Sequence, residues 1–342
     1  MAASIKGVYY PSWSNMDPSS IKTKHYTHIF YAFLNPNNST FQFQIDQTQA
    51  PLLRNFTSTL RAANPPLTTL FSVGGASEGT AIFSRLASNR SSRAAFIHSS
   101  IQVARTFGFD GVDLDWEFPQ TRTEMENLGY LLDEWRAAVQ REAANTRRRP
   151  LLLTAAVYYS AVFSWGEPRA FPAASMSRNL DLINVMNYDY HGSWNTSFTG
   201  AHSAMSTSDG LGSWIRAGVP RSKLVMGLPL YGRTWKLRDR RVHGVGAAAV
   251  GAGPGSDEPG MLTYAEVLEF NRTKNAMVVH DVATESMYSV AGDNWVGYDD
   301  ERTVTAKIAY AKNLGIRGYF FWAIDGDYHW TISKRASEQW RP

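Results

Sequence analysis

The chain has 342 residues, of which 44% are hydrophobic, and this content is sufficient to bury a large core. Its net charge is only +4 and most of its arginines and lysines are scattered, which argues against a nucleic-acid partner. Cysteine is absent, which excludes disulfides, thiolate zinc sites and a cysteine nucleophile. No run approaches the ~18 apolar residues of a membrane span, so we expect no membrane partner.

Eight short runs of β-forming residues recur along the chain, with amphipathic stretches between many of them. The runs are Gly7–Tyr10, His28–Leu34, Thr68–Val73, Gly111–Asp115, Leu151–Val157, Leu182–Asn187, Leu224–Leu230 and Gly318–Trp322. The clearest helical stretches are Ser91–Phe107, Glu124–Ala144 and Asp300–Leu314. This alternation predicts an α/β fold with parallel strands and crossover helices, and eight such units favour a closed (β/α)₈ TIM barrel.

The interval between the seventh and eighth predicted strands is too long for one crossover helix. It contains the glycine-rich segment Gly244–Gly260, followed by strand-like pieces. Long loops without secondary structure are uncommon in compact domains. We therefore predict a small α+β subdomain at residues 236–299, inserted between strand 7 and strand 8 of a barrel formed by residues 1–235 and 300–342.

The fourth predicted strand carries carboxylates at every second position. Asp113, Asp115 and Glu117 alternate with apolar residues, and alternate residues of a strand share one face. Glu117 stands at the carboxyl end of the strand, where barrel enzymes keep their active sites. The pattern predicts a row of acids that points into the barrel.

Burying three neighbouring acids is costly, because burial and like charges both disfavour ionisation. The same arrangement keeps one carboxylic acid protonated near neutral pH, as the proton donor of a glycosidase requires. The alternatives for this segment are an acidic strand that faces solvent and a cation site. An EF-hand does not fit, because Phe118 stands where the calcium loop needs glycine.

The segment from Asp110 to Glu117 resembles the DGxDxDWE signature of glycoside hydrolase family 18, and the chain as a whole resembles plant class V chitinases. Further segments resemble motifs of this family in the same order along the chain. These segments are Ser72–Gly75, Met186–Asp189, Gly227–Arg233 and Gly318–Trp322.

The resemblance implies hydrolysis of β-1,4-linked N-acetylglucosamine in chitin and chito-oligosaccharides, most simply in an endo-acting mode. Retention would be substrate-assisted, with the 2-acetamido oxygen as nucleophile. Glu117 would donate the proton, Asp115 would orient the acetamido N–H, and Asp113 would tune Asp115 by sharing a proton. Tyr188 would hydrogen-bond the acetamido carbonyl. The chemistry needs no cofactor and no metal, and we expect neither.

The resemblance also implies a set of substrate-binding residues. Asp189 and Arg233 would contact sugar hydroxyls, and Trp322 would form the floor beneath the distorted sugar. Tyr9, Phe33 and Ser72 match family positions that line the same pocket or support the acidic strand, and packing is the alternative role for these three. The further candidates are Met186 and Tyr231.

Three aromatic residues follow predicted strands in loops that form the active-site rim of such barrels. Phe163 and Trp165 follow the fifth strand, and Trp194 follows the sixth. They either cap a hydrophobic cluster or hold a sugar on the leaving-group side. In the second case we expect transglycosylation beside hydrolysis.

Two other functions remain compatible with the same barrel, because a fold does not decide its function. One is a non-catalytic chitinase-like lectin or inhibitor, and the other is an endo-β-N-acetylglucosaminidase. We expect a secreted monomer, with plant defence as one compatible role. We expect no signal peptide within this chain, since its N-terminal residues contain no long apolar run, whereas N-glycosylation sequons occur at Asn38, Asn55, Asn89, Asn195 and Asn271.

Overall fold

The computed structural model describes residues 4–205, 210–256 and 258–341. Eight parallel strands close into a barrel in the order β1-β16-β9-β8-β5-β4-β3-β2, which confirms the predicted fold class. The barrel strands are β1 (Ile5–Pro11), β2 (His28–Ala32), β3 (Thr68–Gly74), β4 (Gly111–Asp115), β5 (Leu152–Tyr158), β8 (Leu182–Met186), β9 (Leu224–Pro229) and β16 (Gly318–Trp322).

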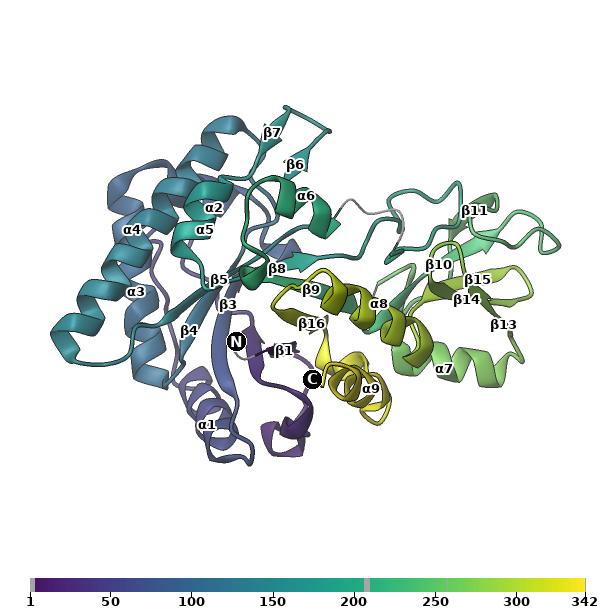
Figure 1. The fold of residues 1–342 in the computed structure, drawn as a ribbon, viewed down its shortest axis with the longest axis horizontal. Coiled ribbons are helices and arrows are strands. Elements are labelled where there is room, and N and C mark those ends of the chain that lie inside the picture. The colour runs from purple at the N-terminus through teal and green to yellow at the C-terminus, as the bar shows by residue number, and fades with distance from the viewer. Residues whose placement is uncertain (1–3, 206–209, 257, 342) are drawn as a thin grey trace. The chain divides into compact units, whose positions relative to one another are not determined.

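Helices connect most of these strands, as the alternation in the sequence predicts (Figure 1). They are α1 (Gln49–Ala62), α2 (Ala81–Ser88), α3 (Arg90–Phe107), α4 (Arg122–Thr146), α5 (Ala173–Asn179), α6 (Gly210–Arg216), α8 (Glu301–Asn313) and α9 (Thr331–Gln339). Short 3-10 helices span Pro18–Ser20, Thr23–His25, Ala76–Glu78, Arg221–Lys223 and Ile324–Gly326.

The described chain forms two compact units. The first comprises residues 4–185, 210–225 and 316–318, and the second comprises residues 186–205, 226–256, 258–315 and 319–341. Strands β8, β9 and β16 contribute residues to both units.

In the first unit, the strands bury apolar residues against the surrounding helices. Val112 and Leu114 of β4 are almost fully buried, and α3 and α4 lie side by side outside the strands (Figure 1). The Phe96 ring of α3 meets the edge of the Trp135 ring of α4, with 4.9 Å between the ring centroids. Because apolar residues face outward to these helices, the intervening residues of β4 point into the barrel.

The second unit contains an antiparallel sheet between strands β9 and β16, which confirms an inserted α+β part between barrel strands 7 and 8. Its strands are β10 (Tyr231–Leu237), β11 (Ala249–Ala252), β12 (Met261–Thr263), β13 (Met277–Asp281), β14 (Ser286–Ala291) and β15 (Asn294–Tyr298). Helix α7 (Tyr264–Thr273) packs beside the sheet (Figure 1). Trp235 and Trp295 are fully buried at its core. The exact boundaries 236 and 299 stay a prediction.

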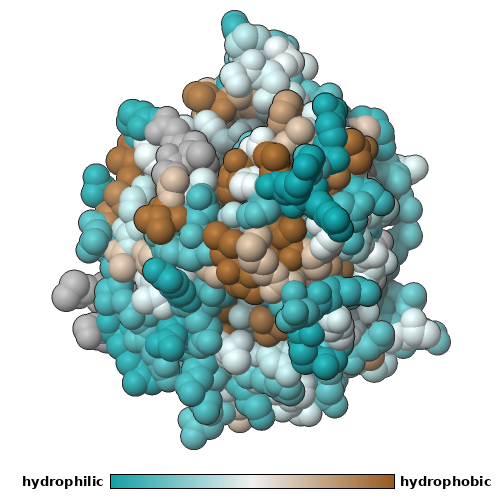
Figure 2. Space-filling model, turned by 90° about the vertical axis from the view of Figure 1, so that its right-hand side faces the viewer, coloured by the Kyte–Doolittle hydropathy of each residue, from teal (hydrophilic) through white to brown (hydrophobic). Residues whose placement is uncertain are grey.

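The outer surface carries several separate apolar patches. Figure 2 shows one face, where hydrophobic residues lie between hydrophilic ones. In the sheet of the second unit, exposed apolar residues occur on both edge strands, at Val250 of β11 and at Met277 and Val278 of β13. Across residues 4–205, 210–256 and 258–341, no helix has the length and apolarity that crossing a membrane requires.

Candidate active site

The acidic row of β4 lies as the alternation in the sequence predicts. Asp113 is fully buried and Asp115 is 4% exposed, while Val112 and Leu114 point to the opposite face. Glu117 follows two residues after the last residue of β4 and is half-buried. The row therefore runs from the buried middle of the strand to the partly open carboxyl end.

Four side chains from other strands surround the Asp113 carboxylate. Ser72 of β3 and Tyr9 of β1 donate hydrogen bonds to Oδ2 at 2.7 and 2.8 Å, and Thr154 of β5 donates to Oδ1 at 2.5 Å. Asn184 of β8 in turn donates to the Tyr9 hydroxyl at 3.2 Å. Burial raises the pKa of Asp113, although these hydroxyl donors oppose the rise.

Asp115 lies in a different environment from Asp113. Its Oδ1 is buried and has no hydrogen-bond partner in the part of the chain that the structure describes. Burial raises the pKa of this carboxyl well above its usual range, and the nearby Glu117 and Asp113 raise it further. The neutral acid is therefore favoured, and one polar atom stays available to a ligand.

The hydroxyl of Thr80 holds the chain on both sides of Glu117. It accepts a hydrogen bond from Trp116 Nε1 at 2.8 Å and donates to the Phe118 carbonyl at 3.1 Å. Thr80 precedes α2 at the N-cap position, yet its side chain makes no capping bond there. Its hydroxyl instead fixes the loop that carries Glu117.

Two glycines let the end of β3 approach β4. A Cβ on Gly74 would lie 2.1 Å from the Asp115 carbonyl oxygen, and a Cβ on Gly75 would lie 2.5 Å from the Phe33 ring. Both have positive φ angles, of 116° and 87°, which glycine adopts without strain. The half-buried Phe33 in turn stacks on Trp13 with centroids 6.2 Å apart.

In the second unit, Asp189 and Arg233 form a bidentate ion pair. The guanidinium donates to the carboxylate through Nε at 2.8 Å and Nη2 at 3.0 Å, and its Nη1 also pairs with Glu258. The buried His202 places Nδ1 3.5 Å from Asp189 Oδ1 and Nε2 3.2 Å from the Tyr231 carbonyl oxygen. Burial alone would raise the pKa of Asp189, but His202 and Arg233 hold it well below its usual range.

The other predicted residues of the second unit lie at strand ends. Tyr188 follows β8 and is 7% exposed, with its ring at edge contacts of 6.1 Å to Tyr231 and 6.2 Å to Phe320. Met186 ends β8 and Trp322 ends β16, and both are half-buried.

The three rim aromatics differ in exposure. Phe163 lies in the short strand β6 (Val162–Phe163), which pairs with β7 (Arg169–Ala170), and not in a loop, and its exposure of 3% agrees with the cluster alternative for this residue. Its ring is covered by Tyr158, by Trp165 and by the guanidinium of Arg169, which lies 4.0 Å from the ring centroid.

Trp165 and Trp194 expose half or more of their surface, at 50% and 60%. Trp165 also lies against Arg169, so one of its faces caps the Phe163 cluster. Trp194 lies 5.2 Å from the Arg233 guanidinium, and Gly192 makes room for its ring, because a Cβ there would lie 2.4 Å from it.

Sequence reasoning missed several residues that support these groups. Asn184 shares a strand face with Met186, so alternation alone could have drawn attention to it. Thr154 is a single polar residue in an apolar strand, which is a weaker signal. No local signal identifies Thr80 and His202, because their partners lie far away in the sequence.

The family model for glycosyl hydrolases family 18 matches residues 6–327. A relative, Class V chitinase CHIT5b of Medicago truncatula, is 48% identical over 346 residues, which cover 98% of this chain and 90% of the relative. The crystal structure of the family 18 chitinase from Cycas revoluta in complex with (GlcNAc)3 has a TM-score of 0.93 at 40% identity, over 98% of this chain and 100% of that chain.

A chitinase-like agglutinin from Robinia pseudoacacia has a similar structure, with a TM-score of 0.89 at 37% identity, over 98% of this chain and 100% of that chain. The family match extends over almost the whole length, and the carboxylates that carry the family signature are all present in this sequence. The chain therefore belongs to family 18 of the glycosyl hydrolases and is a glycoside hydrolase of the chitinase type.

Proposed function

We propose that this protein cleaves β-1,4-linked N-acetylglucosamine chains by substrate-assisted, retaining hydrolysis. The observation that supports this best is the buried Asp115 Oδ1, which has no partner among the described residues while the neighbouring Asp113 has three hydroxyl donors. A buried polar atom without a partner is costly. The amide N–H of an acetamido group would satisfy it.

In the first step, Glu117 gives its proton to the glycosidic oxygen, and the acetamido carbonyl oxygen attacks C1 as that bond breaks. The proton that Asp115 shares with Asp113 moves to Asp113, so that the Asp115 carboxylate accepts the acetamido N–H and stabilises the positive charge of the resulting oxazolinium ion. In the second step, the Glu117 carboxylate takes a proton from water and the water oxygen attacks C1, while the bond between C1 and the acetamido oxygen breaks and restores the acetamido group. Two displacements at C1 leave the product with the β configuration.

The remaining predicted residues bind and orient the sugars. Tyr188 hydrogen-bonds the acetamido carbonyl, and Trp322 supports the distorted sugar. The ion pair of Asp189 and Arg233 contacts sugar hydroxyls, since the half-exposed Asp189 carboxylate retains acceptor capacity toward a ligand. Tyr9 and Ser72 act through Asp113 and not by sugar contact, because both are buried and donate to its carboxylate.

A lectin without turnover is the competing function, and an agglutinin is among the structural neighbours. The presence of the proton donor Glu117 together with both Asp113 and Asp115 favours catalysis. An endo-β-N-acetylglucosaminidase would use the same residues on a different substrate, so a high-mannose glycopeptide serves as the second substrate in the test.

The decisive experiment compares Glu117→Gln with native protein on an N-acetylglucosamine hexamer. We expect retained folding and oligosaccharide binding, with turnover lower by a factor of about 10²–10⁴ or more. Glu126→Gln, on an exposed position of α4, is the matched control and should keep native turnover. Near-native hydrolysis by Glu117→Gln, or α-anomeric initial products, would rule the proposal out.

We further propose that Trp165 and Trp194 hold an acceptor sugar, so that transfer competes with hydrolysis at high substrate concentration. Trp165→Ala and Trp194→Ala should each lower the ratio of transfer to hydrolysis more than total bond cleavage. An unchanged product ratio in both variants would show that the two tryptophans only cap the surface.

We propose that the protein acts as a secreted monomer. Four of its sequon asparagines, Asn38, Asn55, Asn89 and Asn195, are exposed, as glycosylation requires. Expression through a secretory pathway, followed by glycopeptide mass spectrometry and light scattering, would test both points. Unmodified sequons together with a dimeric mass would contradict them.

A further inference from the structure

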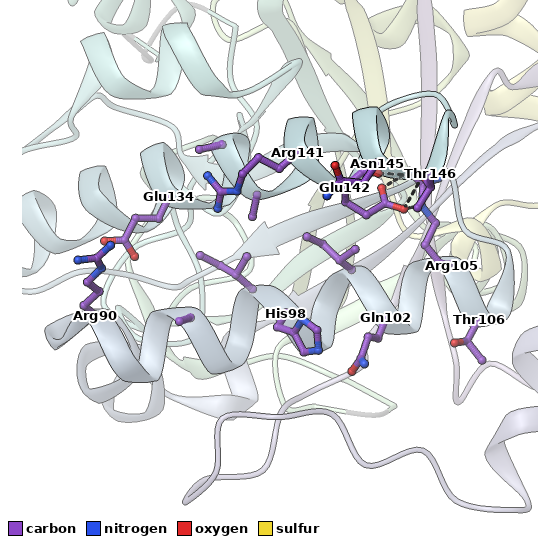
Figure 3. Close-up of a pocket in the computed structure, with 15 residues that line it drawn as sticks. Arg90, His98, Gln102, Arg105, Thr106, Glu134, Arg141, Glu142, Asn145 and Thr146 are labelled. Atoms are coloured by element: carbon purple, nitrogen blue, oxygen red, sulfur yellow. Dashed lines mark hydrogen bonds and ion pairs between the residues drawn. The ribbon is translucent and has the colours of Figure 1, made fainter.

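A groove of about 950 Å³ lies between α3 and α4 in the first unit (Figure 3). Ile97 and Ile101 of α3 contribute apolar surface to its lining, and the polar groups of Gln102 and Asn145 lie along it. None of the residues proposed to act on chitin lines this groove. A ligand bound here would therefore be separate from the carboxylates of β4.

The carboxylates that line the groove are neutralised by arginines. Glu134 accepts two hydrogen bonds from Arg93, at 2.8 and 3.0 Å, and Glu142 accepts two from Arg105, at 2.6 and 2.9 Å. Figure 3 shows the second of these pairs at one end of the groove. Since bidentate arginine pairs are strong, both carboxylates are already paired within the protein and are not available to a ligand.

The cations along the groove lack such partners. Arg90 and Arg141 are exposed, and neither forms an ion pair or a side-chain hydrogen bond with any residue that the structure describes. The fixed charge left over along the groove is therefore positive.

A run of three exposed arginines, Arg147–Arg149, extends this charge beyond the end of α4. The Arg149 carbonyl accepts a hydrogen bond from Arg105 at 2.9 Å, which ties the run to the Glu142 end of the groove. The three guanidinium groups have no ion-pair partner within residues 4–205, 210–256 and 258–341.

The backbone at Arg147 adopts a conformation that disfavours arginine. Its φ of 55° and ψ of 31° are left-handed, at the helix C-terminus where glycine or asparagine usually stands. An arginine there is strained, and strained residues at a surface cluster point to a function of the side chain.

We propose that the α3–α4 groove and Arg147–Arg149 together bind a linear polysaccharide that carries carboxylates, such as a uronic acid polymer. Guanidinium groups match carboxylates in geometry and charge. Amide and hydroxyl side chains at the groove can bond sugar hydroxyls, and the isoleucines can meet the apolar faces of sugar rings. Single-stranded nucleic acid fits less well, because no phenylalanine, tyrosine or tryptophan lines the groove to stack bases.

The test measures binding of the full chain to polygalacturonate, with neutral dextran as the reference polymer. Arg147→Gln/Arg148→Gln/Arg149→Gln should bind polygalacturonate about tenfold or more weakly, and added salt should weaken native binding. Arg141→Gln, within the groove, should weaken it to a smaller extent. The second basic run offers a matched control, because Arg238→Gln/Arg240→Gln/Arg241→Gln removes the same charge elsewhere and should bind as the native protein does.

Hydrolysis of soluble chito-oligosaccharides should be unchanged in all these variants, which also shows that they fold. Arg147→Gly separates strain from binding, since it should raise the melting temperature and still weaken binding. Equal losses in both triple variants would reduce the effect to net charge and overturn the proposal. Equal binding of dextran, or tighter binding of single-stranded DNA than of polygalacturonate, would overturn it too.

Discussion

The Thr80 hydroxyl contacts the residues on both sides of Glu117 and none of the acids themselves. Thr80→Val keeps the shape of the side chain but removes both hydrogen bonds. We expect kcat to fall roughly 10-fold to 100-fold, because misplacing a proton donor by about 1 Å has effects of this size. Kinetics on the N-acetylglucosamine hexamer, with circular dichroism for folding, would measure it.

Thr80→Ser is the control for this prediction, since it restores the hydroxyl without the methyl group. It should recover most of the native kcat, and neither variant should change KM greatly. If Thr80→Val lowers the melting temperature and leaves kcat intact, the two hydrogen bonds of the Thr80 hydroxyl contribute to stability alone.

The shifted pKa of Asp115 predicts a dependence of stability on pH. Because burial and the neighbouring carboxylates raise this pKa from 3.8, the folded protein holds a proton that the unfolded chain releases. The stabilisation is present at low pH and is lost as the pH rises through the folded-state pKa. Asp115→Asn cannot ionise, so its free energy of unfolding should gain on that of the native protein as the pH rises from 3.8 through the folded-state pKa of Asp115.

Urea denaturation of native protein and Asp115→Asn across this pH range would measure the gain, while turnover should be strongly reduced. A constant difference in unfolding free energy at all pH values would contradict the assignment of the proton to Asp115.

At the residue scale, the sequence predicted the acids and two of the residues that support Asp113, Tyr9 and Ser72, but not the third donor, Thr154. Alternation places Asp113, Asp115 and Glu117 on one face from a single strand. The donors to Asp113 come from different strands of the barrel, so only the closed fold brings them together. The cover over Phe163 could not be predicted for the same reason, since Arg169 reaches it from the neighbouring strand β7.

At the scale of elements, the eight predicted barrel strands agree closely with the observed ones, because buried strands carry strong β-forming residues. The predicted helix Glu124–Ala144 begins at Arg122 instead, after a capping box formed by Thr121 and Glu124. Short elements such as α2, α5 and β6 contain too few residues to show a clear hydrophobic periodicity, so the sequence did not predict them. The sheet of the insertion begins at Tyr231. This residue lies inside Gly227–Arg233, which in the sequence resembles a single motif of the family, so the start of the new sheet could not be seen there.

A buried ion pair joins α8 to two loops of the second unit. Lys307 Nζ lies 2.5 Å from Asp299 Oδ1 and also donates to the Ser203 carbonyl at 2.6 Å. Lys307→Met would leave the Asp299 carboxylate buried without its cation. We expect unfolding free energy to fall by about 3–5 kcal/mol, measured by chemical denaturation.

Lys334→Met, at an exposed position of α9, is the control and should change stability little. If Lys307→Met is as stable as this control, the hydrogen bonds from Ser203 and Thr303 are sufficient for the buried Asp299 carboxylate without the lysine.

At the scale of the whole molecule, the proposed chemistry supplies its own reacting groups. The nucleophile comes from the substrate and the proton comes from Glu117, so a metal ion has no step to assist. Within the described residues, no cluster of three histidine or acidic side chains could hold one. Turnover of the hexamer should therefore survive EDTA. Inactivation by EDTA that zinc or magnesium reverses would contradict this.

The row that joins Ser72, Asp113 and Thr154 crosses three adjacent strands at one level, since the register pairs Ser72 with Asp113 and Asp113 with Thr154. A slip of β3 by one residue would set an apolar side chain, Phe71 or Val73, opposite the acid. Losing a donor to a buried carboxylate costs about 1–3 kcal/mol or more. The hydroxyls around Asp113 therefore discriminate against misaligned strands during folding, as well as supporting the acids in the folded barrel.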